Sequence, residues 1–302
     1  MPFVELNAVS KSYGPKRAVA DLSLTIEPGA IVGLLGPNGS GKTSTIRMMI
    51  GITRPDSGSV RLFDAPANRN ALRRVGYLPE ERGLYKKMRV LDQLVFFAEL
   101  HGVHAAAARR SALQWCERLE LTDVLRKPTQ ELSKGMQQKV QFIATLLHTP
   151  DLIIMDEPFS GLDPVNAVAM QDVLVEQRAV GRSILLSTHR MDQAEKLCDA
   201  ICLVNDGRAV LSGTLREVRA HYPSNRVEIE FDGSSDFLTH ASIAQSRNWP
   251  GHAEITLRDG ADAQQLLVAA MQSARIRRFE LCEPTLEQIF IDAVTRGGPA
   301  HA

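Results

Sequence analysis

The segment GPNGSGKT, residues 36–43, combines glycines with one lysine and one hydroxyl residue at the spacing G-x-x-x-x-G-K-[ST]. Glycines at this spacing let successive backbone N–H groups turn inward around a phosphate chain, at the positive end of the following helix. Lys42 would reach the β- and γ-phosphates of a nucleotide, and the Thr43 hydroxyl would bind Mg²⁺. The pattern arises by chance in roughly 1% of chains of this length. We therefore expect a nucleotide-binding loop that comprises Gly36, Pro37, Asn38, Gly39, Ser40, Gly41, Lys42, Thr43 and Ser44.

A second group of reactive residues is LIIMDEP, residues 152–158, in which two carboxylates follow an apolar run. A buried strand would deliver Asp156 to its carboxyl end, the edge where open α/β sheets bind their ligands. Asp156 would hold Mg²⁺ through water, and Glu157 could polarise the water that attacks the γ-phosphate. Taken alone, DEP is also typical of a turn that starts a helix. Downstream of a phosphate-binding loop, the catalytic interpretation is favoured.

The segment LSKGMQQKV, residues 132–140, could form another anion site. Ser133 can cap a helix that runs into the apolar stretch beyond Gln138, and the free N–H groups near Gly135 would then face an anion. On its own the segment is most simply an ordinary helix N-cap. Its functional interpretation therefore depends on the other motifs of the chain.

Short apolar runs must position these residues, and over the first 220 residues they alternate with helical patterns, as in βαβ units. The runs at 31–35, 152–155, 183–187 and 200–204 are too apolar to face water, so we expect them inside a parallel sheet. Residues 89–147 contain no convincing strand and show helical spacing of apolar residues instead. The predicted fold class is α/β, a P-loop NTPase with a helical insertion.

The composition changes near residue 223, where HYPSNR has the Pro, Ser and Asn content of a linker. After Pro284, Thr285 and Gln288 form a capping-box pattern that predicts a final helix. We predict a nucleotide-binding domain at 1–222, whose helical part spans about 84–150, and a small C-terminal α+β accessory domain at 224–298. In the accessory domain, the sequence predicts strands at 227–231, 253–258 and 276–281 and a further helix at 261–274.

Composition narrows the function classes. Lys+Arg and Asp+Glu both total 35, so the formal net charge is zero and a nucleic-acid partner is not expected. No window has the run of about 18 apolar residues that a membrane span requires, and the start lacks the pattern of a secretory signal. The four cysteines form no CxxC pair, which argues against a disulfide framework or zinc knuckle and favours reduced thiols in the cytosol. Any membrane role would thus come through a partner chain.

Residues 4–215 resemble the ATP-binding subunit of an ABC transporter, because several separately spaced motifs occur in that family's order. The resemblance implies an ABC ATPase domain that binds ATP and Mg²⁺ and forms a head-to-tail dimer on ATP binding. The partner would be a second copy or a related ATPase, and each ATP would lie between one subunit's P-loop and the other's signature helix. The motifs are GPNGSGKT, YLPEERG at Tyr77, LSKGMQQ, LIIMDEP, SGLD at Ser160 and STH ending at His189.

The resemblance also assigns residue roles. Ser133 and Gly135 would contact ATP from the partner subunit, and Asp163 would cross the dimer interface. His189 would sense the γ-phosphate and act with the other catalytic residues, Glu157 and Lys42. Tyr13 matches the aromatic residue that stacks on adenine, although a partly buried strand tyrosine has the same appearance in sequence.

Two departures from the family pattern bear on the site. The signature usually reads LSGGQ, and here Lys134 and Met136 replace a glycine and a glutamine, while Ser133 and Gly135 are kept. The usual Q-loop glutamine is Glu80 in YLPEERG. Glu80 would join Thr43 and Asp156 as an Mg²⁺ ligand and add a negative charge beside the phosphates. The alternative is a carboxylate that simply points to solvent.

YLPEERGLY and the late segment CEPTLEQIFIDAV resemble a narrower group, bacterial exporters whose ATPase and permease are separate chains and which include sodium-efflux ATPases. We expect an ATPase subunit that powers export through an integral-membrane permease, at the cytoplasmic face of the cell membrane. Two other functions stay open from the sequence. One is a soluble switch that acts on nucleic acid or the ribosome, and the other is a regulator that binds ATP without hydrolysis, against which Glu157 argues.

Overall fold

The computed structural model describes residues 1–81, 83–222, 225–258 and 260–295 of the chain. The chain divides into two compact units, one made of Met1–Leu215 with the C-terminal residues from Ala293, and one made of Arg216–Asp292. The predicted linker residues 223–224 and the predicted domain end at 298 lie outside the described residues.

The core of the first unit is a six-stranded sheet in the order β10-β9-β3-β8-β7-β6. Five strands are parallel, and β10 pairs antiparallel with β9 at one edge. All residues of β3, β7 and β8 are buried, because helices cover the sheet and leave no strand face for water. The four predicted buried strands are confirmed. The strands are β3 (Ile31–Leu35), β6 (Val75–Leu78), β7 (Leu152–Asp156), β8 (Ser183–Thr188), β9 (Ala200–Asn205) and β10 (Arg208–Thr214).

A second sheet, in the order β2-β1-β4-β5, is antiparallel, and the expectation of βαβ units throughout the first 220 residues is wrong here. In β2 (Lys16–Ile26), Leu22, Leu24 and Ile26 are buried and alternate with exposed residues. This period-2 pattern is typical of a sheet with one face on the core. The other strands are β1 (Val4–Tyr13), β4 (Ser57–Leu62) and β5 (Ala65–Pro66).

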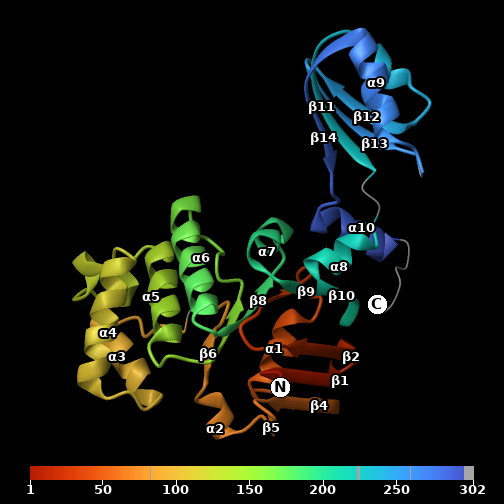
Figure 1. Ribbon diagram of the computed structural model, residues 1–302. Helices are drawn as coiled ribbons and strands as arrows, with labels where there is room; N and C mark the ends of the chain where they lie inside the picture. The colour runs from red at the N-terminus through yellow and green to blue at the C-terminus, as the bar shows by residue number, and fades with distance from the viewer. Residues whose placement is uncertain (82, 223–224, 259, 296–302) are drawn as a thin grey trace. The chain divides into compact units, whose positions relative to one another are not determined.

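Helices α3, α4 and α5 gather at one end of this unit, apart from the antiparallel sheet (Figure 1). Residues 89–147 contain no strand of the named sheets, only one isolated bridge between Arg89 and Pro128, so the predicted helical insertion is confirmed. The helices of the unit are α1 (Lys42–Met49), α2 (Arg69–Leu72), α3 (Val90–Leu100), α4 (Ala105–Arg118), α5 (Lys134–Leu146), α6 (Pro164–Ala179) and α7 (Met191–Leu197), with short 3₁₀ helices η1 (Thr122–Val124) and η2 (Thr129–Glu131).

The second unit contains an antiparallel sheet in the order β12-β13-β11-β14 with α9 on one face. The three predicted strands and the predicted helix are confirmed. The sequence does not predict β12 (Ile243–Trp249), because six of its seven residues are exposed and only one of these six, Trp249, is a large hydrophobic residue. The capping box is also confirmed: the N–H of Thr285 donates to Gln288, and the N–H of Gln288 donates to Thr285. The elements are β11 (Arg226–Gly233), η3 (Asp236–Thr239), β13 (His252–Leu257), α9 (Ala263–Ser273) and β14 (Ala274–Cys282), with α8 (Leu215–Ala220) and α10 (Leu286–Thr295) at the boundaries with the first unit.

Within the part of the chain that the structure describes, no helix is long and apolar enough to span a bilayer. The four cysteines are unpaired, and three of them are buried.

Candidate active site

Four loops meet at one edge of the central sheet, because β3, β6, β7 and β8 run parallel and end on the same side. The loop after β3 is the glycine-rich segment that leads into α1. Asp156 ends β7, His189 follows β8, and Glu80 follows β6. The parallel topology therefore brings together motifs that are more than 100 residues apart in the sequence.

Two glycines of the loop are required by its backbone path. Gly36 has a φ of 152°, and a Cβ there would lie 2.1 Å from the carbonyl oxygen of Val204. Gly41, at the N-cap of α1, has a φ of 110°, and a Cβ there would lie 2.5 Å from the carbonyl oxygen of Ala18. No other residue fits either position, since the main chain of a neighbouring strand or hairpin cannot move aside. The loop thus presents its main chain at the start of α1.

Lys42 is only 6% exposed although it is the first residue of α1. Its Nζ donates to the carbonyl oxygens of Gly36 at 2.7 Å and Pro37 at 3.1 Å. Burial lowers the pKa of the Lys42 ammonium, and the carboxylates of Glu157, Asp156 and Glu80 oppose this shift. The cation is therefore held inside the loop by carbonyl oxygens, with three carboxylates around it.

Asp156 and Thr43 form the candidate magnesium site. The Thr43 hydroxyl donates to Oδ2 of Asp156 at 2.8 Å, and the Ser187 hydroxyl donates to Oδ1 at 2.8 Å. Asp156 is 1% exposed, so its carboxylate is fixed in place by these two hydroxyls. Hydroxyl and carboxylate oxygens suit Mg²⁺, which is commonly held by one or two carboxylates together with phosphates. The donor set fits that mode. It does not form a cage of three or more His, Cys, Asp or Glu side chains, and none exists among the described residues.

Glu157 has a strained backbone and a fully engaged carboxylate. Its φ is 49°, in the left-handed region that non-glycine residues rarely adopt. The Glu157 N–H donates to the carbonyl oxygen of Ser187 at 2.9 Å, which holds this conformation. The Thr188 hydroxyl donates to Oε2 at 3.2 Å, while the N–H of His189 donates to Oε1 at 3.0 Å. Nδ1 of His189 lies 2.8 Å from the same Oε1. The β8 end therefore orients the carboxylate.

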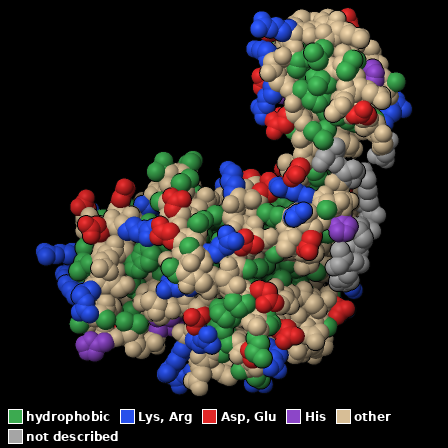
Figure 2. All heavy atoms as spheres, viewed as in Figure 1, with side chains coloured by type: hydrophobic (Ala, Val, Ile, Leu, Met, Phe, Trp, Pro, Cys, Tyr) green, Lys and Arg blue, Asp and Glu red, His purple; other side chains and the backbone are tan. Residues whose placement is uncertain are grey.

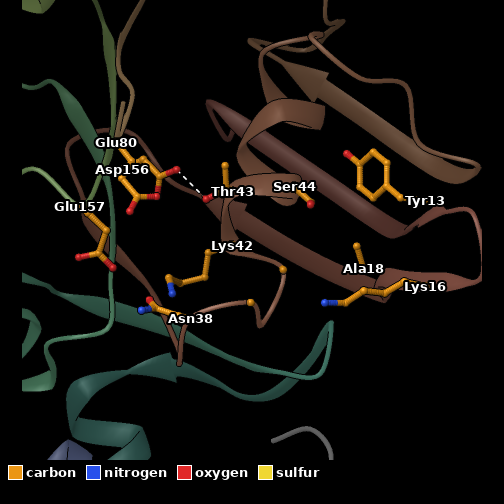
Figure 3. Close-up of a pocket in the computed structure, with 12 residues that line it drawn as sticks. Tyr13, Lys16, Ala18, Asn38, Lys42, Thr43, Ser44, Glu80, Asp156 and Glu157 are labelled. Carbon is orange, nitrogen blue, oxygen red and sulfur yellow. Dashed lines mark hydrogen bonds between the residues drawn. The ribbon is translucent and has the colours of Figure 1, made fainter. Parts of the chain in front are cut away.

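These residues border a cavity of about 500 Å³ (Figure 3). In the view of Figure 3, Lys42 and Thr43 lie between the carboxylates of Asp156 and Glu157 on one side and Tyr13 on the other. Tyr13 ends β1 and is 44% exposed, so its ring is available to a ligand. Of the predicted residues, the cavity is lined by Tyr13, Asn38, Gly39, Gly41, Lys42, Thr43, Ser44, Glu80, Asp156 and Glu157.

Lys16 and Ala18 also line the cavity and were not predicted. They lie at the start of β2, directly after the turn that follows Tyr13, so a hairpin prediction around Gly14 and Pro15 could have found them.

Seven predicted residues do not line this cavity: Gly36, Pro37, Ser40, Ser133, Gly135, Asp163 and His189. The first three belong to the glycine-rich loop, and His189 contacts Glu157. Ser133 caps α5 by accepting from the N–H of Met136 at 3.2 Å, and Gly135 lies in the first turn of that helix. Asp163 caps α6 by accepting from the N–H of Asn166 at 3.0 Å, and this hydrogen bond lowers the pKa of the Asp163 carboxyl. Ser133 and Asp163 are exposed, so both helix starts face outward from the subunit.

Two buried glutamines of α5 connect that helix to the site, and nothing in their sequence spacing predicts this. Gln138 Nε2 donates to the carbonyl oxygen of Pro158 at 2.9 Å, directly after Glu157. Gln141 Nε2 donates to the carbonyl oxygens of Pro79 at 3.3 Å and Glu81 at 3.2 Å, on both sides of Glu80. The helix that begins at Ser133 therefore braces the loops that carry Glu80 and Glu157.

Comparisons with known proteins agree with this geometry. A family profile described as "ABC transporter" matches residues 19–160, and one described as "ATP-binding protein DrrA1-3-like, C-terminal domain" matches residues 213–294. The chain is 40% identical over 290 residues to the uncharacterised ABC transporter ATP-binding protein YhaQ of Bacillus subtilis, covering 96% of this chain and 97% of that one. It is 39% identical over 213 residues to the Nod factor export ATP-binding protein I of Paraburkholderia xenovorans, covering 70% of each chain.

A solved structure described as the ATP-binding subunit of an ABC transporter superposes with a TM-score of 0.69 at 32% identity, covering 73% of this chain and 93% of that one. Sequence, fold and site geometry therefore agree, and the chain belongs to the ATP-binding subunits of ABC transporters, which are ATPases.

Proposed function

We propose that this subunit hydrolyses ATP at an interface between two ATPase subunits and that hydrolysis powers export through a separate membrane permease. The observation that carries the proposal is that Lys42, Glu157 and the hydrogen-bonded pair of Thr43 and Asp156 line one cavity. A protein that only binds ATP does not need a carboxylate oriented by three donors beside the phosphate loop.

Glu157 is the proposed general base. Its carboxylate lies next to Lys42 and is held by Thr188 and His189, so it can accept a proton from the attacking water without reorganising. Lys42 and the inward-facing amides of the loop would stabilise charge on the transferring phosphoryl group. Tyr13 would stack on the adenine ring of ATP, and Lys16 lines the same cavity.

Thr43, Asp156 and Glu80 would hold Mg²⁺, which supplies positive charge to the phosphate oxygens when it is bound. Two of these residues are joined by a 2.8 Å hydrogen bond, and Glu80 lines the same cavity. Glu80 is the exposed member of the set, so its carboxylate can approach or leave the metal as the loop moves.

The helix starts at Ser133 and Asp163 support a second subunit. Both are exposed and lie outside the cavity, so a partner's ATP is the ligand that they could reach. An N-cap serine with Gly135 beside it offers N–H groups to an anion at the positive end of α5. In a head-to-tail dimer each α5 would close the other subunit's site.

The brace from Gln141 supports coupling to a permease. A permease that presses on the loop around Glu80 would also act on α5, since one side chain joins them. Glu81, Gly83 and Tyr85 are the proposed permease contacts; Arg82, between them, lies outside the described residues. Export is supported by the Nod factor export relative, and the permease would bring the subunit to the cytoplasmic face of the membrane.

The C-terminal unit is proposed to regulate the subunit or to bind a partner. Its described residues contain no phosphate-binding loop, and its sheet carries ion pairs such as Arg226–Glu254 at 3.0 Å. The proposed end of the ATPase domain is residue 222, and the accessory domain follows it.

A detergent pull-down tests the proposed function. The full chain with an affinity tag, expressed in its own host with ATP present, is expected to retain a multi-span membrane protein that is lost when Tyr85 is changed to Asp. Recovery of ribosomes or nucleic acid in place of a membrane protein would contradict the transport role.

A further inference from the structure

The helical end of the first unit carries cations that the ATP site does not use. Lys86, Lys87 and Arg89 precede α3, and Arg126 and Lys127 precede η2. All five side chains are exposed. Residues 84–89 and 125–128 contain these five Lys and Arg residues and no Asp or Glu, in a chain whose formal net charge is zero. We call these five residues the basic platform.

The backbone holds the two segments of the basic platform side by side. The N–H of Val90 donates to the carbonyl oxygen of Lys127 at 3.1 Å, and the N–H of Thr129 donates to that of Met88 at 3.1 Å. The N–H of Gln130 donates to the carbonyl oxygen of Lys86 at 3.0 Å. These main-chain hydrogen bonds therefore hold the two cationic segments together, although like charges repel.

No carboxylate of the described residues forms an ion pair with any side chain of the basic platform. Within the same residues, these side chains also make no hydrogen bond, so their long stems are free to turn toward an external anion. Figure 2 shows Lys and Arg side chains, together with Asp and Glu side chains, at the end of the unit that carries α3 and α4.

Tyr85 directly precedes the basic platform and is 55% exposed. Its ring lies 6.0 Å from that of Phe97 and 5.9 Å from that of Phe96, so an aromatic cluster adjoins the cations. Exposed aromatic rings next to Lys and Arg are typical of protein surfaces that contact the headgroup region of a bilayer.

We propose that the basic platform binds the anionic phospholipid headgroups of the membrane that contains the permease. The inference rests on the proposed function, because Tyr85 is a proposed permease contact and Lys86 follows it directly. A leaflet presents many phosphates across a fluid plane, which suits unpaired, flexible cations from two segments better than a single fixed anion does. Lipid contact would thus add to the permease contact in holding the subunit at the membrane.

Vesicle flotation of the full chain without permease tests this inference. The probes are vesicles of phosphatidylcholine alone and of phosphatidylcholine with phosphatidylglycerol, each at low and high salt. The test variant changes Lys86, Lys87, Arg126 and Lys127 to Gln. The matched control changes four exposed cations elsewhere to Gln, Arg69, Arg73, Arg247 and Arg275, with the same change in net charge.

We expect the wild type and the control to float with phosphatidylglycerol vesicles at low salt only, and neither to float with phosphatidylcholine alone. The test variant should bind about fivefold more weakly for each cation removed, with its basal ATPase activity unchanged. If the test variant fails to fold, the Lys86→Gln/Lys87→Gln pair provides the same comparison.

Equal flotation of the test and control variants would overturn the inference. So would a wild type that floats equally with and without phosphatidylglycerol in the vesicles. If the wild type floats with neither kind of vesicle, and the test variant loses the membrane protein in the pull-down, the basic platform binds a protein partner instead. Because the vesicles lack permease, failure to bind them would not contradict the proposed function, which the pull-down tests separately.

Discussion

Nδ1 of His189 and Oε1 of Glu157 lie 2.8 Å apart, and the N–H of His189 donates to the same oxygen at 3.0 Å. One residue at the end of β8 therefore holds the proposed base with its ring and its main chain. Donation from Nδ1 to Glu157 and from Nε2 to a γ-phosphate oxygen at the same time, as the proposed sensing role requires, needs a proton on both ring nitrogens.

Replacing His189 with Ala should lower ATP turnover about 100-fold, because the carboxylate loses one orienting donor and the phosphate loses a contact. ATP affinity should change only a few-fold, since Lys42 and the loop are intact. Arg190→Ala is the matched control, as Arg190 is the exposed neighbour and pairs with Asp192 at 3.2 Å. Equal turnover in the two variants would remove His189 from the site.

Replacing Lys42 with Ala should weaken Mg·ATP binding about 100-fold, because a charge-assisted contact to the phosphates is lost. Isothermal titration measures the affinity, and a thermal melt checks that the variant folds. Lys16→Ala, at the cavity rim, should weaken binding only a few-fold. Near-wild-type affinity of the Lys42 variant would refute the phosphate-binding role of this loop.

Replacing Glu80 with Gln should make ATP binding less dependent on Mg²⁺. Without metal, the Glu80 carboxylate repels the phosphates, and with metal it is the stronger ligand, so the wild-type affinity ratio should exceed that of the variant about tenfold. Affinities with Mg²⁺ and with a chelator give the ratio. Glu81→Gln is the control, since Glu81 is exposed and does not line the cavity. Identical ratios for wild type and Glu80→Gln would exclude Glu80 as a ligand.

His148 should make the folded state sensitive to acid. Burial, with His101 stacked at 3.8 Å, lowers the pKa of His148 to about 4, and its Nε2 lies 3.1 Å from the carbonyl oxygen of Val75. Between the ordinary value of 6.5 and about 4 the unfolded chain binds more protons, so stability falls as pH falls through this window. The loss from this group should be about 2 kcal/mol between pH 7 and pH 5.

Urea unfolding of His148→Gln at the two pH values tests this expectation. The variant should lose less stability on acidification than the wild type, and His221→Gln, at an exposed histidine, should lose as much as the wild type. A wild-type slope in His148→Gln would contradict the assignment.

The sequence was informative wherever local chemistry dictates structure. The glycine spacing before Lys42 and the apolar run before Asp156 predicted both the elements and their meeting at one sheet edge, because parallel strands end on the same side. Ser133 was predicted as an N-cap from its side chain alone.

What could not be predicted depends on tertiary contact. Gln138 and Gln141 look like ordinary helix residues, and only the folded chain brings their amides to the loops of Glu157 and Glu80. The strand β12 has an exposed sequence and exists through pairing with β13. Lys16 and Ala18 reach the cavity through the β1–β2 hairpin, whose strands are not evident from the sequence pattern.

The most direct test of the account is Glu157→Gln, with ATP affinity, single-turnover hydrolysis and light scattering measured on one preparation. Affinity should stay within a few-fold of wild type, hydrolysis should fall at least about 100-fold because the water loses its proton acceptor, and ATP should trap the protein as a dimer. A variant that hydrolyses ATP at nearly the wild-type rate, or that stays monomeric in saturating ATP, would contradict hydrolysis by Glu157 at a subunit interface.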